Sequence, residues 1–469
     1  MDALLDQGAL EQSAALETRR ISAEELMQAT LARIDARNPR VNAVVSMADP
    51  EALLAEARQA DQTPRKGWMH GLPLAVKDLA NAAGLRTSMG SPIMAGQVAR
   101  SDDLMVARMR RAGAIFIGKT NTPEFGLGSH TFNPVHGATG NAFDPSVSAG
   151  GSSGGAAVAL ACRMLALADG SDMMGSLRNP AGWNNVYGMR PSWGRVPDEA
   201  EGETFLHGLS TNGPMARNPR DLAALLEVQS GPNPARPFTL PREAFLSRID
   251  ADVRGRRVAW LGDWGGAYPM EAGVLETCEA ALRTFDTLGI AVEAPEPPFD
   301  AAALWRSWLD LRAFANASRL GPLYDNPDWR RQLKATAIWE IETGHALTLD
   351  AVKAASLTRS RWYARAAALF DQYDALILPT AQVWPFPLAQ EYPTQIAGRA
   401  MDTYHRWMEV VIPASLIGLP AIALPAGFGP AGLPMGLQLI GRHGDDLGLL
   451  QLAQAWHQAS GWADRQPPG

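Results

Sequence analysis

The sequence is poor in cysteine and has no long apolar run. Only Cys162 and Cys278 occur among 469 residues, so neither a disulfide framework nor a cysteine-based zinc site is expected. No stretch of about 18 apolar residues predicts a membrane span, and the acidic first residues are unlike a signal peptide. These absences predict a cytoplasmic protein without a membrane partner.

Positive charge is also in the minority. The chain has 42 Lys and Arg against 49 Asp and Glu, which gives a formal net charge of −7. No basic stretch could neutralise a row of phosphates, so a nucleic-acid partner is not expected. The length allows a large buried core, and length alone would permit two or three domains.

Glycine and serine, in contrast, gather in two short segments. Residues 148–155 read SAGGSSGG and residues 169–178 read DGSDMMGSLR, which places Ser152 and Ser176 24 residues apart. A serine nucleophile needs a base within hydrogen-bond reach. Lys77, in the apolar run GLPLAVKDL, can serve as that base if burial keeps it neutral. The alternative is that Lys77 pairs with Asp78 at a strand end, and the residues alone do not decide between the two.

The glycines beside Ser152 have a conformational use. They permit positive φ and let backbone N–H groups approach a ligand closely. The composition of residues 156–168 predicts a helix that starts at this Gly/Ser run. Residues 169–175 would then fold the chain back so that Ser176 faces Ser152. For GGSSGG alone, an ordinary serine-rich helix cap is the alternative.

Two other motifs match the sequence by letter. Residues 113–120, GAIFIGKT, fit the P-loop pattern, but their apolar centre predicts a strand that follows a helix over 102–111. Residues 151–155, GSSGG, fit the nucleophile elbow, which would make Ser153 the nucleophile. An elbow follows an apolar strand, and residues 144–148 are a poor one. Nucleotide binding is therefore not expected, and the elbow stays as a testable alternative.

Several segments together resemble the amidase signature family. They are GLPLAVKD and the stretches 117–129, 141–159, 170–181, 412–428 and 432–442. By this resemblance Ser176 corresponds to the nucleophile, Ser152 to a bridging serine joined to Gly151 by a cis peptide bond, and Lys77 to the base. The resemblance implies one α/β domain, with a large twisted mixed β-sheet covered by helices on both faces. It also implies hydrolysis of a C–N amide bond, or a similar acyl bond, through an acyl-enzyme without cofactor or metal.

The resemblance implies further roles around these three residues. Backbone N–H groups of the nucleophile loop would form the oxyanion hole, at Met173, Met174, Gly175 and Ser176. Side chains that would support the site are Ser153, Asp172 and Arg178. Substrate contacts are expected from Gly126, Leu127, Gly128 and Ser129. The family loop usually reads Asp-Thr-Gly-Gly-Ser, so Met174 replaces a glycine here, and methionine would be strained if that position needed positive φ.

The order of helix and strand signals predicts four regions of one domain. They are N-terminal helices in 1–65, the signature core in 66–235, a variable helical cap in 240–400, and a return to the sheet in 405–469. Helices are predicted at 22–37, where Ser22 and Glu25 form a capping box, at 271–288 and within 300–370. Strands are predicted at 73–76, 114–118, 256–261, 374–380, 421–425 and 435–440.

Aromatic residues bear on the substrate. The chain has 14 tryptophans, and Trp384 and Trp407 fall near the expected pocket. With Met173 and Met174 they favour a small apolar or aromatic amide-type substrate, although core packing explains any single tryptophan equally well. Two alternatives stay open, the glutaminase subunit of a tRNA-dependent amidotransferase and a catalytically impaired binding protein on the same scaffold. A homodimer is a possible assembly.

Overall fold

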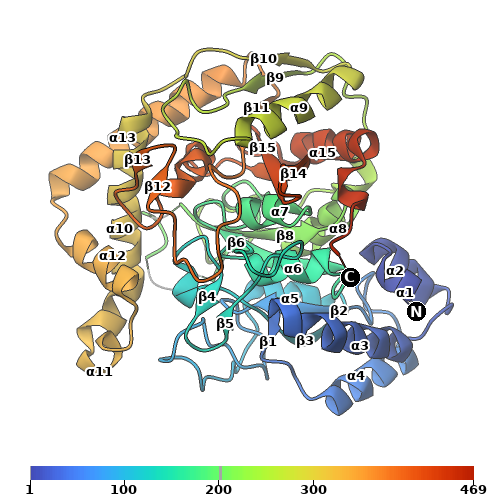
Figure 1. Cartoon of the computed structure of the whole chain (residues 1–469). Helices are drawn as coiled ribbons and strands as arrows, with labels where there is room; N and C mark the ends of the chain where they lie inside the picture. Colours follow the sequence, from blue (N-terminus) through green and yellow to red (C-terminus); the bar gives the residue numbers. More distant parts are fainter. Residues whose placement is uncertain (1, 200–202, 207, 469) are drawn as a thin grey trace.

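The computed structural model describes residues 2–199, 203–206 and 208–468. Within them, a mixed sheet of eight strands forms the centre, in the order β10-β9-β11-β15-β14-β7-β8-β6 (Figure 1). The strands are β6 (Leu167–Asp172), β7 (Tyr187–Arg190), β8 (Thr211–Ala216), β9 (Arg257–Trp260), β10 (Ala291–Glu293), β11 (Ala375–Pro379), β14 (Ala421–Phe428) and β15 (Pro434–Ile440). β9 runs parallel to β10 and β11, and the other neighbours are antiparallel.

Helices cover both faces of this sheet. Successive side chains of a strand point to opposite faces, and in β14 Ile422 and Leu424 belong to one apolar core while Ala423 belongs to another. The first core includes residues of α9 and α15, and the second includes residues of α6 and α7. The bounds are α6 (Gly154–Ala161), α7 (Arg178–Trp183), α8 (Pro219–Gln229), α9 (Val274–Thr287), α14 (Ile412–Ser415) and α15 (Asp446–Ser460). The predicted α/β fold is therefore confirmed.

A second, three-stranded sheet lies beside the first and carries Lys77. Its order is β1-β3-β2, with β1 (Val44–Val45), β2 (Pro73–Lys77) and β3 (Ile115–Thr120). Helices beside it in the chain are α1 (Asp2–Leu5), α2 (Ala9–Glu17), α3 (Ala23–Val41), α4 (Pro50–Gln62) and α5 (Leu104–Arg111). The capping box of Ser22 and Glu25 is present at the start of α3. Because β3 contains most of GAIFIGKT and is buried throughout, this segment is a strand and not a phosphate loop.

One predicted helix is wrong in extent. α6 ends at Ala161, and Arg163 just after it has a φ of 59°. Residues Leu167–Asp172 form β6 instead, which pairs with β8 along its whole length. The run AAVALACRMLALA has helical composition, but residues 162–166 turn the chain, and only Leu167 and Ala168 at its end pair in the sheet. The strand thus leads directly into the loop that holds Ser176.

Four helices form a separate layer along one side of the molecule (Figure 1). They are α10 (Ala301–Asp325), α11 (Pro327–Arg330), α12 (Ala335–His345) and α13 (Leu349–Leu369), and α10 packs against α12 and α13. The helical cap expected over 240–400 is narrower, because β9, β10 and β11 from that range belong to the central sheet. Two short hairpins pair β4 (Phe132–Asn133) with β5 (Gly137–Ala138) and β12 (Gln395–Ile396) with β13 (Arg399–Ala400). None of the described helices is long and apolar enough to cross a membrane.

Candidate active site

Lys77 ends β2 in the interior, surrounded by hydroxyl groups. Its side chain is 1% exposed, and Nζ lies 2.8 Å from Ser152 Oγ, 2.9 Å from Ser153 Oγ and 3.0 Å from Ser171 Oγ. Burial lowers the pKa of Lys77 from 10.5 to about 7, against the charges of Asp169 and Asp172, which raise it. Because of this burial, a large fraction of Lys77 is the neutral amine at neutral pH.

Asp78 does not bind the Lys77 ammonium. Its carboxylate accepts hydrogen bonds from the backbone N–H of Ser88, at 3.0 Å, and from the Ser88 hydroxyl. The side chain of Lys77 instead turns toward the Gly/Ser segment. The alternative of a simple Lys77–Asp78 pair at the strand end is therefore wrong.

Ser152 and Ser153 lie side by side at the start of α6. The peptide bond between Gly151 and Ser152 is cis, as the family resemblance implies. The residues before α6 form bends and isolated bridges and no strand, so the nucleophile elbow lacks the element that it requires. Ser153 is also fully buried against Lys77.

Ser176 lies next to this pair of serines. The N–H of Ser153 donates to the carbonyl of Ser176 at 3.2 Å, and the N–H of Gly151 donates to Oδ1 of Asn179 at 3.2 Å. These bonds join the nucleophile loop to the Gly/Ser segment. The structure thus brings together the three residues predicted as catalytic, Lys77, Ser152 and Ser176.

Asp172 fixes the shape of the nucleophile loop from inside. Its carboxylate accepts from the N–H groups of Gly175 at 2.9 Å and Leu177 at 3.1 Å, and from the guanidinium of Arg178 at 3.0 and 3.1 Å. Burial alone would raise the pKa of Asp172, but the charges of Arg178 and Arg190 hold it well below its usual range. An ionised Asp172 therefore holds the loop across physiological pH.

The predicted oxyanion-hole residues separate into two groups. Gly175 has a φ of 77° and donates its N–H to Asp172, so its amide is already engaged. The amides of Met173, Met174 and Ser176 are not used in this way. Met174 does not adopt positive φ, so the strain considered for a methionine at this position is absent. Its side chain is 3% exposed and belongs to the main core, whereas that of Met173 is half-buried.

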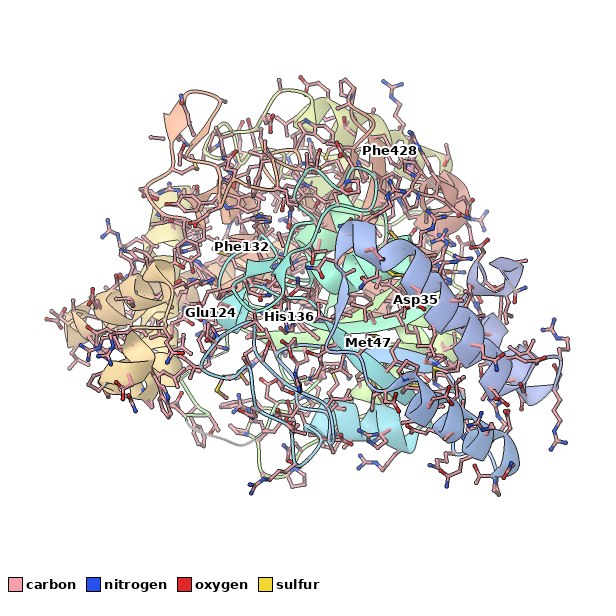
Figure 2. All side chains as sticks on the ribbon, turned by 60° about the horizontal axis from the view of Figure 1, so that its bottom comes forward. Asp35, Met47, Glu124, Phe132, His136 and Phe428 are labelled. Carbon is pink, nitrogen blue, oxygen red and sulfur yellow. The ribbon has the colours of Figure 1, made fainter. Side chains whose placement is uncertain are left out.

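A cavity of about 120 Å³ lies near the Gly/Ser segment, with none of Lys77, Ser152 and Ser176 in its lining. Leu127, Gly128 and Ser129, three of the predicted substrate contacts, line it. Gly126, the fourth, does not line it, and an added Cβ there would come 3.7 Å from Ser152 Oγ. Trp407, which the sequence places near the expected pocket, also lines it. The sequence did not reveal the other lining residues as substrate contacts; they are His130, Phe132, Lys334, Ala335, Thr336, Glu391, Tyr392 and Tyr404. Figure 2 shows Phe132 and Glu124 where the loops meet the helical layer, and Glu124 there accepts from the N–H of Lys334 at 3.2 Å.

Two more residues near Lys77 were also missed. Asp169 accepts the backbone N–H of Lys77 at 3.1 Å, and Ser171 approaches its Nζ. Both lie in β6, two positions apart, so their side chains point to the same face. Strand alternation in DGSD would have revealed them, had the segment been predicted as a strand.

Comparison with known proteins agrees with this geometry. The family model described as Amidase matches residues 25–450. The chain belongs to the amidase family. An acylamidase of Rhodococcus erythropolis is 33% identical, with 98% of this chain and 96% of that protein aligned. A glutamyl-tRNA(Gln) amidotransferase subunit from Thermus thermophilus is 34% identical over 96% of both chains.

Solved amidase structures match the whole fold. A bacterial aryl acylamidase of the amidase signature family superposes with a TM-score of 0.91 at 27% identity, covering 98% of both chains. A 6-aminohexanoate cyclic dimer hydrolase in complex with its substrate gives 0.88 at 27% identity, covering 99% of both chains. The amidase signature predicted from the sequence motifs is thus confirmed, and this chain is an enzyme that acts on amides.

Proposed function

We propose that this amidase cleaves amides that carry an aromatic or apolar group, through an acyl-enzyme on Ser176. The observation that carries the proposal is the contact of 2.8 Å between Lys77 Nζ and Ser152 Oγ, next to the loop of Ser176. Lysine in this buried position is neutral often enough to accept a proton.

The reaction proceeds by a proton relay. Ser176 Oγ attacks the carbonyl carbon while its proton passes to Ser152 and from Ser152 to Lys77. The proton then returns by way of Ser152 to the leaving amine, and water hydrolyses the acyl-enzyme by the reverse path. We propose that the amides of Met173, Met174 and Ser176 donate to the oxyanion, each contributing roughly 3 kcal/mol.

The pocket favours aromatic or apolar groups. Phe132, Tyr392, Tyr404 and Trp407 form much of its lining. Flat apolar groups gain most from such walls, through buried area and ring contacts. The names of two similar proteins, an acylamidase and an aryl acylamidase, support the same substrate class.

Glutamine hydrolysis for a tRNA-dependent amidotransferase is the second candidate. It is favoured by the identity of 34% to the Thermus thermophilus amidotransferase subunit over nearly the whole chain. The two candidates differ in the substrate that they turn over alone. We expect an anilide to be cleaved with a much higher kcat/KM than glutamine, and the reverse order would favour the amidotransferase role.

Covalent labelling tests the mechanism. Phenylmethanesulfonyl fluoride should add one sulfonyl group, located on Ser176 by peptide mass spectrometry, and hydrolysis should be lost in parallel. Ser176→Ala should abolish both labelling and turnover. If Ser153→Ala were the inactive variant and Ser176→Ala kept its activity, the elbow mechanism would replace this one. A ligand-binding protein without any turnover would exclude both mechanisms.

The setting of the enzyme is part of the proposal. We place it in the cytoplasm, acting on small molecules and without a nucleic-acid partner. We also propose that it works without cofactor or metal, and a homodimer is the assembly to test by light scattering.

A further inference from the structure

A buried arginine connects the nucleophile loop with the wall of the pocket. Arg312 lies on α10, is 4% exposed, and directs three nitrogens to three different elements. Nε donates to Glu340 Oε1 at 2.6 Å, Nη2 donates to Tyr404 Oη at 2.8 Å, and Nη1 lies 3.5 Å from Met173 Sδ. Met173 belongs to the loop of Ser176, and Tyr404 lines the pocket.

Arg312, Tyr404 and Glu340 are joined to one another by three hydrogen bonds. Tyr404 accepts from Arg312 and donates its own proton to Glu340 Oε1 at 2.7 Å. Burial would raise the pKa of Glu340, but the Arg312 charge, with His405 and the Tyr404 hydrogen bond adding to it, lowers the pKa, so the carboxylate stays ionised. The pair is neutral as a whole, and a planar guanidinium can serve three partners in one plane, which a lysine cannot.

The ring of Tyr404 forms part of the pocket wall next to Gly128. An added Cβ on Gly128, one of the predicted substrate contacts, would lie 3.7 Å from a ring carbon of Tyr404. The rings of Trp339 and Tyr392 stand edge-on to the same ring, with centroids 6.1 and 6.3 Å away. With its hydroxyl held by Arg312 and Glu340, the ring faces the pocket in one orientation.

We propose that Arg312 is a specificity-determining positioning residue of this amidase. It holds the Met173 side chain and the Tyr404 ring in fixed positions, so that a planar aromatic group fits between the pocket wall and the nucleophile loop. Arg312 does not touch the reacting atoms, and it acts through Met173 and Tyr404. The inference rests on the proposed function, since it concerns the substrate of the same site.

The test compares an anilide with an acetamide-sized amide in matched variants. Arg312→Lys keeps the charge but cannot hold three partners, and Arg306→Lys, at an exposed position of the same helix, is the control. Arg312→Lys should lower kcat/KM for the anilide roughly tenfold more than for the small amide, mainly through KM. Arg306→Lys should change neither.

A double-mutant cycle separates positioning from simple stability. Met173→Leu removes the sulfur at nearly constant volume, and its effect on the anilide should overlap with that of Arg312→Lys, so that the double variant loses less than the product of the two. Equal losses on both substrates, or full additivity with Met173→Leu, would overturn the inference. If Arg312→Lys does not fold, Tyr404→Phe should show the same selective loss, and an unchanged substrate ratio there overturns it too.

Failure of the inference and failure of the proposed function have different signatures. Sulfonyl labelling of Ser176 in Arg312→Lys, together with an unchanged substrate ratio, overturns the inference and leaves the mechanism intact. Absence of labelling at Ser176 in the wild-type enzyme overturns the mechanism, and the inference with it.

Discussion

Removing the charge of Asp169 should move the pH profile of this amidase toward acid. Asp169 accepts the backbone N–H of Lys77 at 3.1 and 3.3 Å, and its charge raises the pKa of Lys77 against the larger effect of burial. Asp169→Asn keeps an oxygen for this N–H but removes the charge. Lys77 must be neutral to accept the proton, so kcat/KM rises with pH through its pKa. A lower pKa therefore brings activity at lower pH.

The size of the effect follows from the burial of Lys77. Lowering its pKa from 10.5 to about 7 corresponds to about 5 kcal/mol in favour of the neutral amine. At pH 7 about half of Lys77 is then neutral, compared with roughly one in 3000 for an exposed lysine. Loss of the Asp169 charge should lower the midpoint by about one further pH unit.

The wild-type profile should also have a composite shape. Burial raises the pKa of Asp169 to about 6, close to that of Lys77, so the acid limb describes the pair and not one residue. Asp169→Asn should leave a single ionisation. The pH profile of Asp169→Asn should therefore show one ionisation and a midpoint at lower pH.

The assay is kcat/KM for an anilide from pH 5 to 9, with the rate of inactivation by phenylmethanesulfonyl fluoride as a second measure of Ser176 reactivity. Asp371→Asn, at an exposed position, serves as the control. A midpoint that stays in place, or one that moves to higher pH, would refute the assignment of Lys77 as the base.

The remaining predictions concern stability and metal dependence. Lys77→Met should abolish turnover and raise the free energy of unfolding at pH 7 by up to about 4 kcal/mol. Lys77 of the unfolded chain keeps its proton up to pH 10.5, so this gain in stability should shrink as the pH rises from 7 to 10.5. A gain in stability that does not depend on pH would contradict the lowered pKa of Lys77. Asp172→Asn should cost about 3–5 kcal/mol in urea unfolding, since Arg178 and Arg190 lose their buried counterion, and a neutral effect would contradict that role. Met174→Gly should cost about 2–5 kcal/mol and lower kcat/KM alike for small and aromatic amides, because its side chain packs in the core; a selective loss on aromatic amides would place it in the pocket instead. EDTA should leave the rate unchanged, and activity restored by zinc after chelation would contradict the serine mechanism.

Much of the candidate site could be predicted because its parts are short and local. Glycine next to serine, a lysine in an apolar run, and an Asp before the nucleophile loop are each visible within ten residues of sequence. Their meeting in space depends on two strands that end close together, β2 with Lys77 and β6 before Ser176. The strand 73–76 was predicted correctly, whereas the helix predicted over 156–168 overlaps the first two residues of β6.

The surroundings of the base were missed because residues 169–175 were expected only to fold the chain back toward Ser152, not to begin in a strand. In the strand β6, Asp169 and Ser171 lie two positions apart and so share one face. Alanine and leucine favour a helix by a few tenths of a kcal/mol each, and at Leu167 and Ala168 the pairing of β6 with β8 outweighs that preference. Pairing with partners about 40 to 50 residues away leaves no local trace in composition.

Longer separations explain the rest of what the sequence did not reveal. Arg312 and Met173 are 139 residues apart in the chain and meet through a sulfur contact of 3.5 Å. Nothing near Arg312 in α10 marks it, because an arginine on a helix usually reaches solvent. Only burial together with Glu340 and Tyr404 distinguishes it, and that requires α10, α12 and the segment before the 3₁₀ turn Arg406–Val411 to be packed together. The chemistry of this amidase is therefore encoded in local motifs, whereas the shape of its pocket depends on contacts between distant helices, which is why selectivity is best tested at Arg312.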